Sequence, residues 1–213
     1  MRDCTNLDVA VLVFARAPVP GRVKTRLIPR LGEFRAARLH ARLTARALRT
    51  AVAAGCGRVE MHDTTKQRGA DLGERMYRAL SGALRRHRAA ILIGTDCPAL
   101  RPSDLRRAAR LLAGGCHAVL APVEDGGYVL IGVRRVAPCL FAGIEWGSAG
   151  VYAATAGKLD SLAYRWRALR MLWDVDRPED LERLRALRFP SMPLPGARRS
   201  GGSRARWGGW DRI

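Results

Sequence analysis

The sequence predicts an α/β fold, a three-layer α/β/α sandwich in which helices cover both faces of a mostly parallel sheet. Short apolar runs typical of buried strands alternate with longer arginine- and alanine-rich stretches of helical periodicity. Such alternation requires crossover connections, which place successive strands parallel to one another. The chain has 213 residues, 48% of them hydrophobic. This is enough for one buried core and short for two full domains.

The expected elements follow from these runs in chain order. We expect strands at residues 8–14, 58–62, 90–94, 118–121 and 129–133. We expect helices at residues 33–54 and 71–87, and a further helix that Arg101 and Pro102 open. The sequence EDGGY between the fourth and fifth strands is typical of a turn.

The domain organisation is one domain at residues 1–189 and a tail at residues 190–213. The tail is rich in Pro, Gly, Ser and Arg and has no strand or helix periodicity, a composition typical of disorder. The apolar run near the start is too short for a membrane helix and lacks a signal-peptide pattern. We therefore expect a cytoplasmic protein without a membrane partner. Its five scattered cysteines lack the paired spacing of zinc or redox sites, which favours reduced thiols.

The formal charge of +19 raises one alternative, a noncatalytic protein that binds nucleic acid or acts as a regulator. All but three of the 38 basic residues are arginines, spread along every expected helix and not gathered into one stripe. This spread favours compositional drift, so nucleic acid is not the expected partner. An anionic small molecule is compatible with the charge, and the sequence leaves a homodimer open.

The loop after the first strand is the first candidate site. Its prolines and Gly21 shape a tight turn beside clustered positive charge. Ligands of open parallel sheets bind outside the carboxyl ends of strands, and a helix N-terminus there attracts phosphate. The loop matches neither the P-loop nor the dinucleotide fingerprint, so a plain basic surface loop stays open. The candidate phosphate-binding residues are Arg16, Gly21, Arg22, Lys24, Thr25 and Arg26.

Asp96 is the second candidate, because it follows an apolar strand and should lie at the same edge as the basic loop. A carboxylate there can hold Mg²⁺ or Mn²⁺, with nucleotide phosphates as further ligands. Asp174 and Asp176 stand two apart at the end of a predicted strand, so they share a face and can complete a metal site. In both places the alternative is an aspartate that only caps a turn or helix.

Asp125, Gly126 and Gly127 form a third candidate group. The glycines permit close approach of a ligand, and the Asp125 carboxylate can contact a sugar hydroxyl. The same three residues also form a common turn.

Six sequence blocks in this order resemble one protein family. They are FARAPVPGRVKTRL, QRGADLGERM, GTDCPAL, APVEDGGYVLIGV, IEWG and DVDRPEDL, spanning about Val9 to Leu184. Together they are similar to small bacterial proteins of the GT-A, Rossmann-like fold (DUF2064), described as nucleotide-diphospho-sugar transferase-like or as glycosyltransferases linked to arsenosugar biosynthesis. That family in turn resembles 2-phospholactate and molybdenum-cofactor guanylyltransferases. The chain departs from the family in a short stretch from Met61 to Gln67 and in Gly147 directly after Trp146.

The resemblance implies roles for individual residues. Gly21, Lys24 and Arg26 would contact the nucleotide phosphates, Asp96 would bind Mg²⁺ or Mn²⁺, and Asp176 would be a second metal ligand. The implied substrate pocket consists of Asp71, Arg75, Asp125, Gly126, Gly127 and Trp146.

Two activities fit these residues. The favoured activity is glycosyl transfer, in which a nucleotide-diphospho-sugar donates its sugar to a small acceptor. Asp96 and Lys24 would lie at the departing diphosphate, and Asp125 would be the general base. In the alternative, Lys24 and Arg26 stabilise the pyrophosphate of a nucleoside triphosphate while a phosphate or carboxylate acceptor takes the nucleotide. GTDCP supplies one aspartate where many glycosyltransferases of this fold have an Asp-any-Asp element, which favours the alternative.

Overall fold

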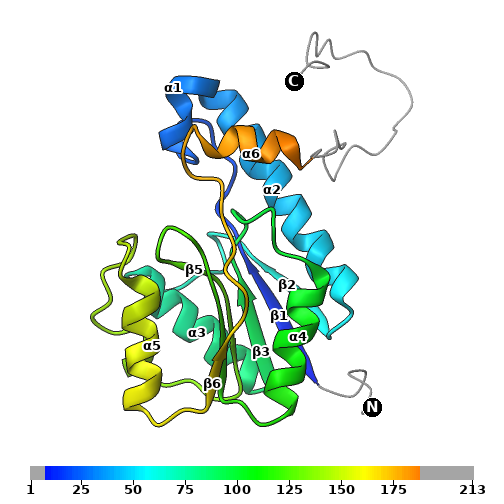
Figure 1. Cartoon of the computed structure of the whole chain (residues 1–213), viewed down its shortest axis with the longest axis vertical. Helices are drawn as coiled ribbons and strands as arrows, with labels where there is room; N and C mark the ends of the chain where they lie inside the picture. The colour runs from blue at the N-terminus through cyan, green and yellow to red at the C-terminus, as the bar shows by residue number, and fades with distance from the viewer. Residues whose placement is uncertain (1–7, 188–213) are drawn as a thin grey trace.

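The computed structural model describes residues 8–187 and shows a six-stranded sheet with helices on both faces (Figure 1). The strand order across the sheet is β2-β1-β3-β5-β4-β6. The strands are β1 (Val9–Phe14), β2 (Arg58–His62), β3 (Ala89–Ile93), β4 (Ala118–Pro122), β5 (Tyr128–Val133) and β6 (Trp166–Ala168). The helices are α1 (Ile28–Leu31), α2 (Glu33–Ala54), α3 (Leu72–Leu84), α4 (Pro102–Ala113), α5 (Val151–Ser161) and α6 (Asp180–Ala186), with short 3-10 turns η2 (Thr25–Leu27) and η3 (Pro138–Leu140).

The sheet is mostly parallel, as predicted. β1 pairs in parallel with β2 and β3, and β4 pairs in parallel with β6. β5 is antiparallel to both of its neighbours, β3 and β4. The short turn between β4 and β5 leaves no room for a crossover, so those strands can pair only in the antiparallel sense. Every strand other than β5 therefore ends at the same edge of the sheet.

Two apolar clusters bury the faces of the sheet and make the three predicted layers. Alternate residues of β1, among them Val11 and Val13, pack with α2 and α4 on one face. The intervening residues, Leu12 among them, pack with α3 and α5 on the other face. β1 is buried along its whole length because helices cover both sides of it.

A third, smaller cluster lies beyond the carboxyl edge of the sheet. It joins Leu27 and Leu43 to Trp173, Val175 and the apolar face of α6. Figure 1 shows α1, α6 and the first turns of α2 together at this end of the molecule. The cluster fixes the basic loop and the last part of the described chain against one another.

The structure corrects one prediction about local structure. The residues before Asp174 were expected to be a strand, but the last strand, β6, already ends at Ala168. The chain then runs as an extended segment from residue 169 to 176 with a single isolated bridge, between Leu172 and Val123. Leu169 and Leu172 donate their N–H groups to carbonyls of β4, which is why the segment continues across the carboxyl edge.

Element boundaries differ from the predicted ones by a few residues, and α5 was not anticipated. The helix expected at residues 71–87 ends at Leu84, because residues 85–88 turn toward β3. α5 carries alanine, glycine and lysine with little amphipathic pattern, so its sequence gave no clear signal.

In residues 8–187, no helix is both long and apolar enough to cross a bilayer. Cys56, Cys97, Cys116 and Cys139 form no disulfide within residues 8–187. The predicted tail at residues 190–213 lies outside the described residues.

Candidate functional site

The basic loop and Asp96 meet at the carboxyl edge of the sheet. The loop leaves the end of β1, and Asp96 follows β3, which is the parallel neighbour of β1. Gly21 adopts a φ of +75° and Lys24 a φ of 50°, both in the left-handed region. Lys24 is the N-cap of η2, and its left-handed backbone conformation is unfavourable for a residue other than glycine.

The Lys24 ammonium is the centre of the site. Nζ lies 2.9 Å from Asp96 Oδ1 and 3.4 Å from Asp176 Oδ1. It also donates to the Val175 carbonyl at 2.5 Å. Only 3% of the Lys24 side chain is exposed, against 43% for Asp96 and 38% for Asp176. A buried cation is thus flanked by two carboxylates that still face solvent.

Arg26 adds a second cation. Its guanidinium donates to Asp176 Oδ2 at 2.8 Å and remains largely exposed. The Asp180 carboxylate accepts the backbone N–H groups of Asp176 and Arg177, which fixes the chain just before α6. The structure therefore brings together Lys24, Arg26, Asp96 and Asp176, and we call these four residues the carboxyl-edge centre.

His40 belongs to the site although no motif in the sequence predicted it. This buried residue of α2 donates from Nε2 to the carbonyl of Arg16 at 3.0 Å. Its Nδ1 lies 3.7 Å from Asp96 Oδ1. His40 thereby ties the start of the basic loop to the carboxylate, which a single histidine within an arginine-rich helix does not reveal from sequence.

The charge state of Asp96 follows from these neighbours. Burial of the group would by itself raise its pKa, but hydrogen bonds and positive charge from His40 and Lys24 outweigh burial and lower the pKa to about 2. Asp96 is therefore an anion at every physiological pH.

Asp174 has the opposite environment. Its pKa is raised to about 7 by burial and by the negative charges of Asp125 and Asp176, and Lys24 offsets this only in part. Asp125 is thus one of the charges that act on this aspartate of the extended segment.

The DGG turn between β4 and β5 borders the same edge. The Asp125 carboxylate accepts the N–H of Gly127 at 2.9 Å and is exposed. Gly126 has a φ of +89°, and a Cβ there would lie 2.0 Å from the carbonyl oxygen of Ala149. Tyr152 donates its N–H to the Gly126 carbonyl. The turn is thus locked onto the start of α5, with Asp125 projecting from it.

Three residues of the implied substrate pocket have other contacts in this structure. Asp71 caps α3, since its carboxylate accepts the N–H of Glu74 at 2.7 Å. Trp146 packs on Gly73, where a Cβ would lie 2.7 Å from its indole ring. Arg75 lines a cavity between α3 and β2. Of the loop residues, Arg16, Arg22 and Thr25 are exposed.

The donor chemistry of the carboxyl-edge centre fits a divalent cation. Mg²⁺ and Mn²⁺ prefer carboxylate oxygens, which Asp96 and Asp176 present on two sides of Lys24. Asp174, whose pKa is raised by burial and by the charges of neighbouring aspartates, adds a further carboxyl group close to them. Within residues 8–187, no three His, Cys, Asp or Glu side chains are already arranged as a metal site. A divalent cation held by these carboxylates would therefore need further ligands from a bound molecule.

Comparison with solved structures identifies the fold class of the chain. A protein of Desulfovibrio desulfuricans G20, provisionally designated a nucleotide-diphospho-sugar transferase, is 30% identical and superposes with a TM-score of 0.74 over 83% of this chain and 85% of that one. A nucleotidyl transferase from Methanothermobacter is 14% identical over 86% of this chain and 98% of that one, with a TM-score of 0.51. The chain therefore has the GT-A-like fold of nucleotide-diphospho-sugar transferases, a fold that nucleotidyl transferases share.

The family follows from a second comparison. The model of the family described as uncharacterized proteins conserved in bacteria (DUF2064) matches residues 33–148, more than half of the chain. The chain belongs to this family. A comparison with curated proteins finds no match.

Proposed function

We propose that this protein is a metal-dependent glycosyltransferase that uses a nucleotide-diphospho-sugar. The observation that carries the proposal is the carboxyl-edge centre, where Lys24 and Arg26 lie against Asp96 and Asp176. Cations beside carboxylates at this edge of an α/β sheet suit a diphosphate bound together with a divalent metal. The 30% identity to the protein designated a nucleotide-diphospho-sugar transferase supports the same class.

The donor diphosphate would bind between the basic loop and the two aspartates. The Lys24 ammonium is held by the Val175 carbonyl and contacts both aspartates, so it would exchange one of these carboxylates for a phosphate oxygen. Arg26 is exposed and can exchange Asp176 for phosphate, a bidentate partner for a guanidinium. Asp96 and Asp176 would hold Mg²⁺ or Mn²⁺, which when bound supplies Lewis-acid stabilisation of the leaving diphosphate.

The acceptor would approach from the DGG turn. Asp125 projects from this turn as an exposed carboxylate, and we propose it as the group that takes the proton of an acceptor hydroxyl. The close contact between Gly126 and Ala149 fixes the turn, so this carboxylate has a defined position. Gly127, Trp146, Asp71 and further residues along this side would shape the acceptor pocket.

Nucleotidyl transfer is the second candidate, and one observation favours it. The loop after β3 has a single aspartate, Asp96, whereas Gly94 and Pro98 stand at the two positions where an Asp-any-Asp element would supply a second carboxylate. In this reaction Lys24 and Arg26 would stabilise the pyrophosphate that leaves a nucleoside triphosphate.

The test is a thermal-shift panel of nucleotide-diphospho-sugars and nucleoside triphosphates, each with and without Mn²⁺, since a ligand that binds only the native state raises its Tm. Glycosyl transfer predicts Mn²⁺-dependent stabilisation by a nucleotide-diphospho-sugar and none by triphosphates, and the reverse pattern would establish the second candidate. Asp96→Asn should abolish the Mn²⁺ dependence, and Lys24→Ala should weaken binding about tenfold or more.

Matched controls for these variants are Glu182→Gln and Lys158→Ala, which remove like charges from α6 and α5 away from the centre. Equal losses of ligand-dependent stabilisation in the variants and the controls would refute a role for the carboxyl-edge centre. Turnover of a stabilising donor, followed by mass spectrometry, then shows whether sugar or nucleotide is transferred.

A further inference from the structure

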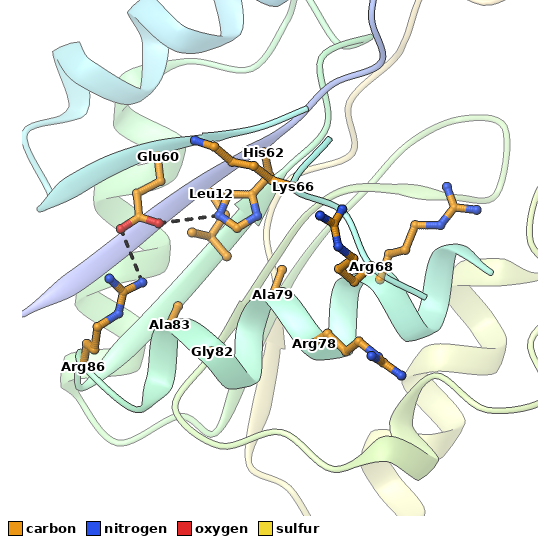
Figure 2. A pocket seen from close by; sticks show the side chains of 11 residues that line it. Leu12, Glu60, His62, Lys66, Arg68, Arg78, Ala79, Gly82, Ala83 and Arg86 are labelled. Carbon is orange, nitrogen blue, oxygen red and sulfur yellow. Dashed lines mark ion pairs between the residues drawn. The ribbon is translucent and has the colours of Figure 1, made fainter. Parts of the chain in front are cut away.

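A lateral pocket of about 180 Å³ lies between α3 and β2, apart from the carboxyl-edge centre. Figure 2 shows its two walls, with Glu60 and His62 of β2 on one side and the α3 face on the other. The pocket exists because α3 presents three small residues toward β2, at Ala79, Gly82 and Ala83. Larger residues at these positions would pack against β2 and close the gap.

Positive charge dominates the lining. Five cations line the pocket against a single carboxylate, that of Glu60, and they are Lys66, Arg68, Arg75, Arg78 and Arg86. In Figure 2, Arg86 lies toward one end of the pocket and Arg68 and Arg78 toward the other.

Only two of these cations have a carboxylate partner in the described chain. Arg78 pairs with Glu74 one turn earlier on α3, and Arg86 lies 3.6 Å from Glu60 Oε1. The side chains of Lys66, Arg68 and Arg75 hydrogen-bond to backbone carbonyl oxygens. The charge of Lys66 helps to lower the pKa of Asp63, whereas Arg68 and Arg75 form no ion pair with a carboxylate within residues 8–187.

His62 adds an unsatisfied polar group on the same wall. Its ring stacks on Phe14 at 5.7 Å between centroids, and its Nε2 lies 3.5 Å from Glu60 Oε2. Its Nδ1 is buried and has no hydrogen-bond partner among the described residues. Buried polar atoms of this kind are rare unless water or a ligand satisfies them.

We propose that the lateral pocket binds a small phosphate-bearing molecule. The excess of unpaired cations favours a multiply charged anion over a single carboxylate, since arginine forks bind phosphate oxygens in pairs. The volume is below the roughly 300–1,000 Å³ of pockets for drug-sized ligands, so a whole nucleotide-sugar does not fit. This site is additional to the donor site, because neither Lys24 nor the aspartates of the carboxyl-edge centre line it.

The experiment uses inorganic phosphate and pyrophosphate as probes with the full chain. Binding is followed by calorimetry, and amide hydrogen exchange shows where the anion binds. Slower exchange is expected in β2, the 62–68 loop and α3. Two variants should weaken this binding about tenfold or more: Lys66→Gln/Arg86→Gln, which removes charge, and Gly82→Leu, which fills the cavity while favouring the helix.

The matched control is Arg85→Gln/Arg88→Gln, which removes two exposed arginines adjacent in sequence to Arg86 but outside the lining. It should change affinity less than about twofold. Equal losses in the control would show nonspecific charge attraction, and protection confined to the Lys24 loop would place the anion at the carboxyl-edge centre; either result overturns the proposal. The Mn²⁺-dependent donor response should persist in the lateral-pocket variants, so the proposed transferase activity is tested separately.

Discussion

At the scale of single residues, the carboxyl-edge centre is organised by a buried lysine. Lys24 has lost most of its contact with water, and the desolvation of an ammonium is unfavourable unless hydrogen bonds and opposite charge replace the water. Asp96, Asp176 and the Val175 carbonyl supply these replacements. The arrangement keeps a cation fixed before any ligand arrives.

Asp174 should make stability depend on pH in the metal-free protein. Its folded pKa of about 7 is above the roughly 4 of an unfolded aspartate. Between these values the native state holds a proton that the unfolded state has released, so the free energy of unfolding falls as pH rises from about 4 to about 7. Asp174→Asn should remove this fall and raise Tm at pH 8 by about 2–4 °C.

Chemical unfolding at pH 5 and pH 8 measures this effect, with the exposed Asp160→Asn as control. An unchanged pH dependence in Asp174→Asn would show that Asp174 is ionised normally in the folded chain. The reverse sign, with Asp174→Asn destabilising at pH 8, would show that the carboxylate is paired with a cation.

Sequence reasoning found most charged groups of the centre because each followed a strand. Lys24, Arg26 and Asp96 belong to segments just after β1 and β3, and parallel neighbours end at one edge. His40 was missed because it reaches the site from within α2. The lateral pocket was not predicted either. It forms where small side chains leave a gap between α3 and β2, and no sequence motif predicts such a gap.

At the scale of elements, the extended segment at residues 169–176 determines where Asp176 lies. Arg170 holds this segment to α4 through two hydrogen bonds to the Asp104 carboxylate, at 3.0 and 2.9 Å, and a third to the Ala99 carbonyl. The hydrogen bonds to Asp104 raise the pKa of Arg170. Asp104 is nearly buried, so the pair is shielded from solvent on one side.

A double-mutant cycle should find strong coupling in this pair. Arg170→Ala, Asp104→Ala and the double variant should give a coupling energy of about 1–3 kcal/mol in urea unfolding. The exposed Arg183–Glu124 pair, with 49% and 54% side-chain exposure, is the matched comparison. It should give at most about 1 kcal/mol. Equal coupling in both pairs would contradict the role assigned to burial.

Gly126 provides a second test at this scale. Gly126→Ala introduces both an unfavourable φ of +89° and a Cβ 2.0 Å from the Ala149 oxygen. Gly147→Ala carries the same kind of strain at φ +93° but meets no atom within 4 Å. We expect the free energy of unfolding to fall by about 1 kcal/mol in Gly147→Ala and by about 3 kcal/mol or more in Gly126→Ala.

The difference between these two glycine variants isolates the contact between the DGG turn and α5. Urea unfolding measures both, and the m-value shows whether the native state itself has changed. Similar losses would mean that the turn can move away from Ala149 and is not locked.

At the scale of the whole molecule, the layer architecture was predictable and the last third of the chain was less so. Apolar runs predicted β1, β3, β4 and β5 because these strands are buried along nearly their whole length, whereas β2 is only partly buried. α5, β6 and the extended segment have mixed polarity and depend on contacts with β4 and the third cluster. Tertiary packing determines where these segments lie, and the local propensities of their residues do not predict it.

The position of the extended segment in the chain has a consequence for biosynthesis. β1, β3 and the loop with Lys24 leave the ribosome long before residues 169–176, yet these late residues bring the Val175 carbonyl and the Asp176 carboxylate to Lys24. A nascent chain can therefore assemble its early parallel strands while its lysine still lacks these partners. The capacity to hold a nucleotide in the proposed way is acquired only once residues 169–176 have been synthesised, after most strands of the sheet.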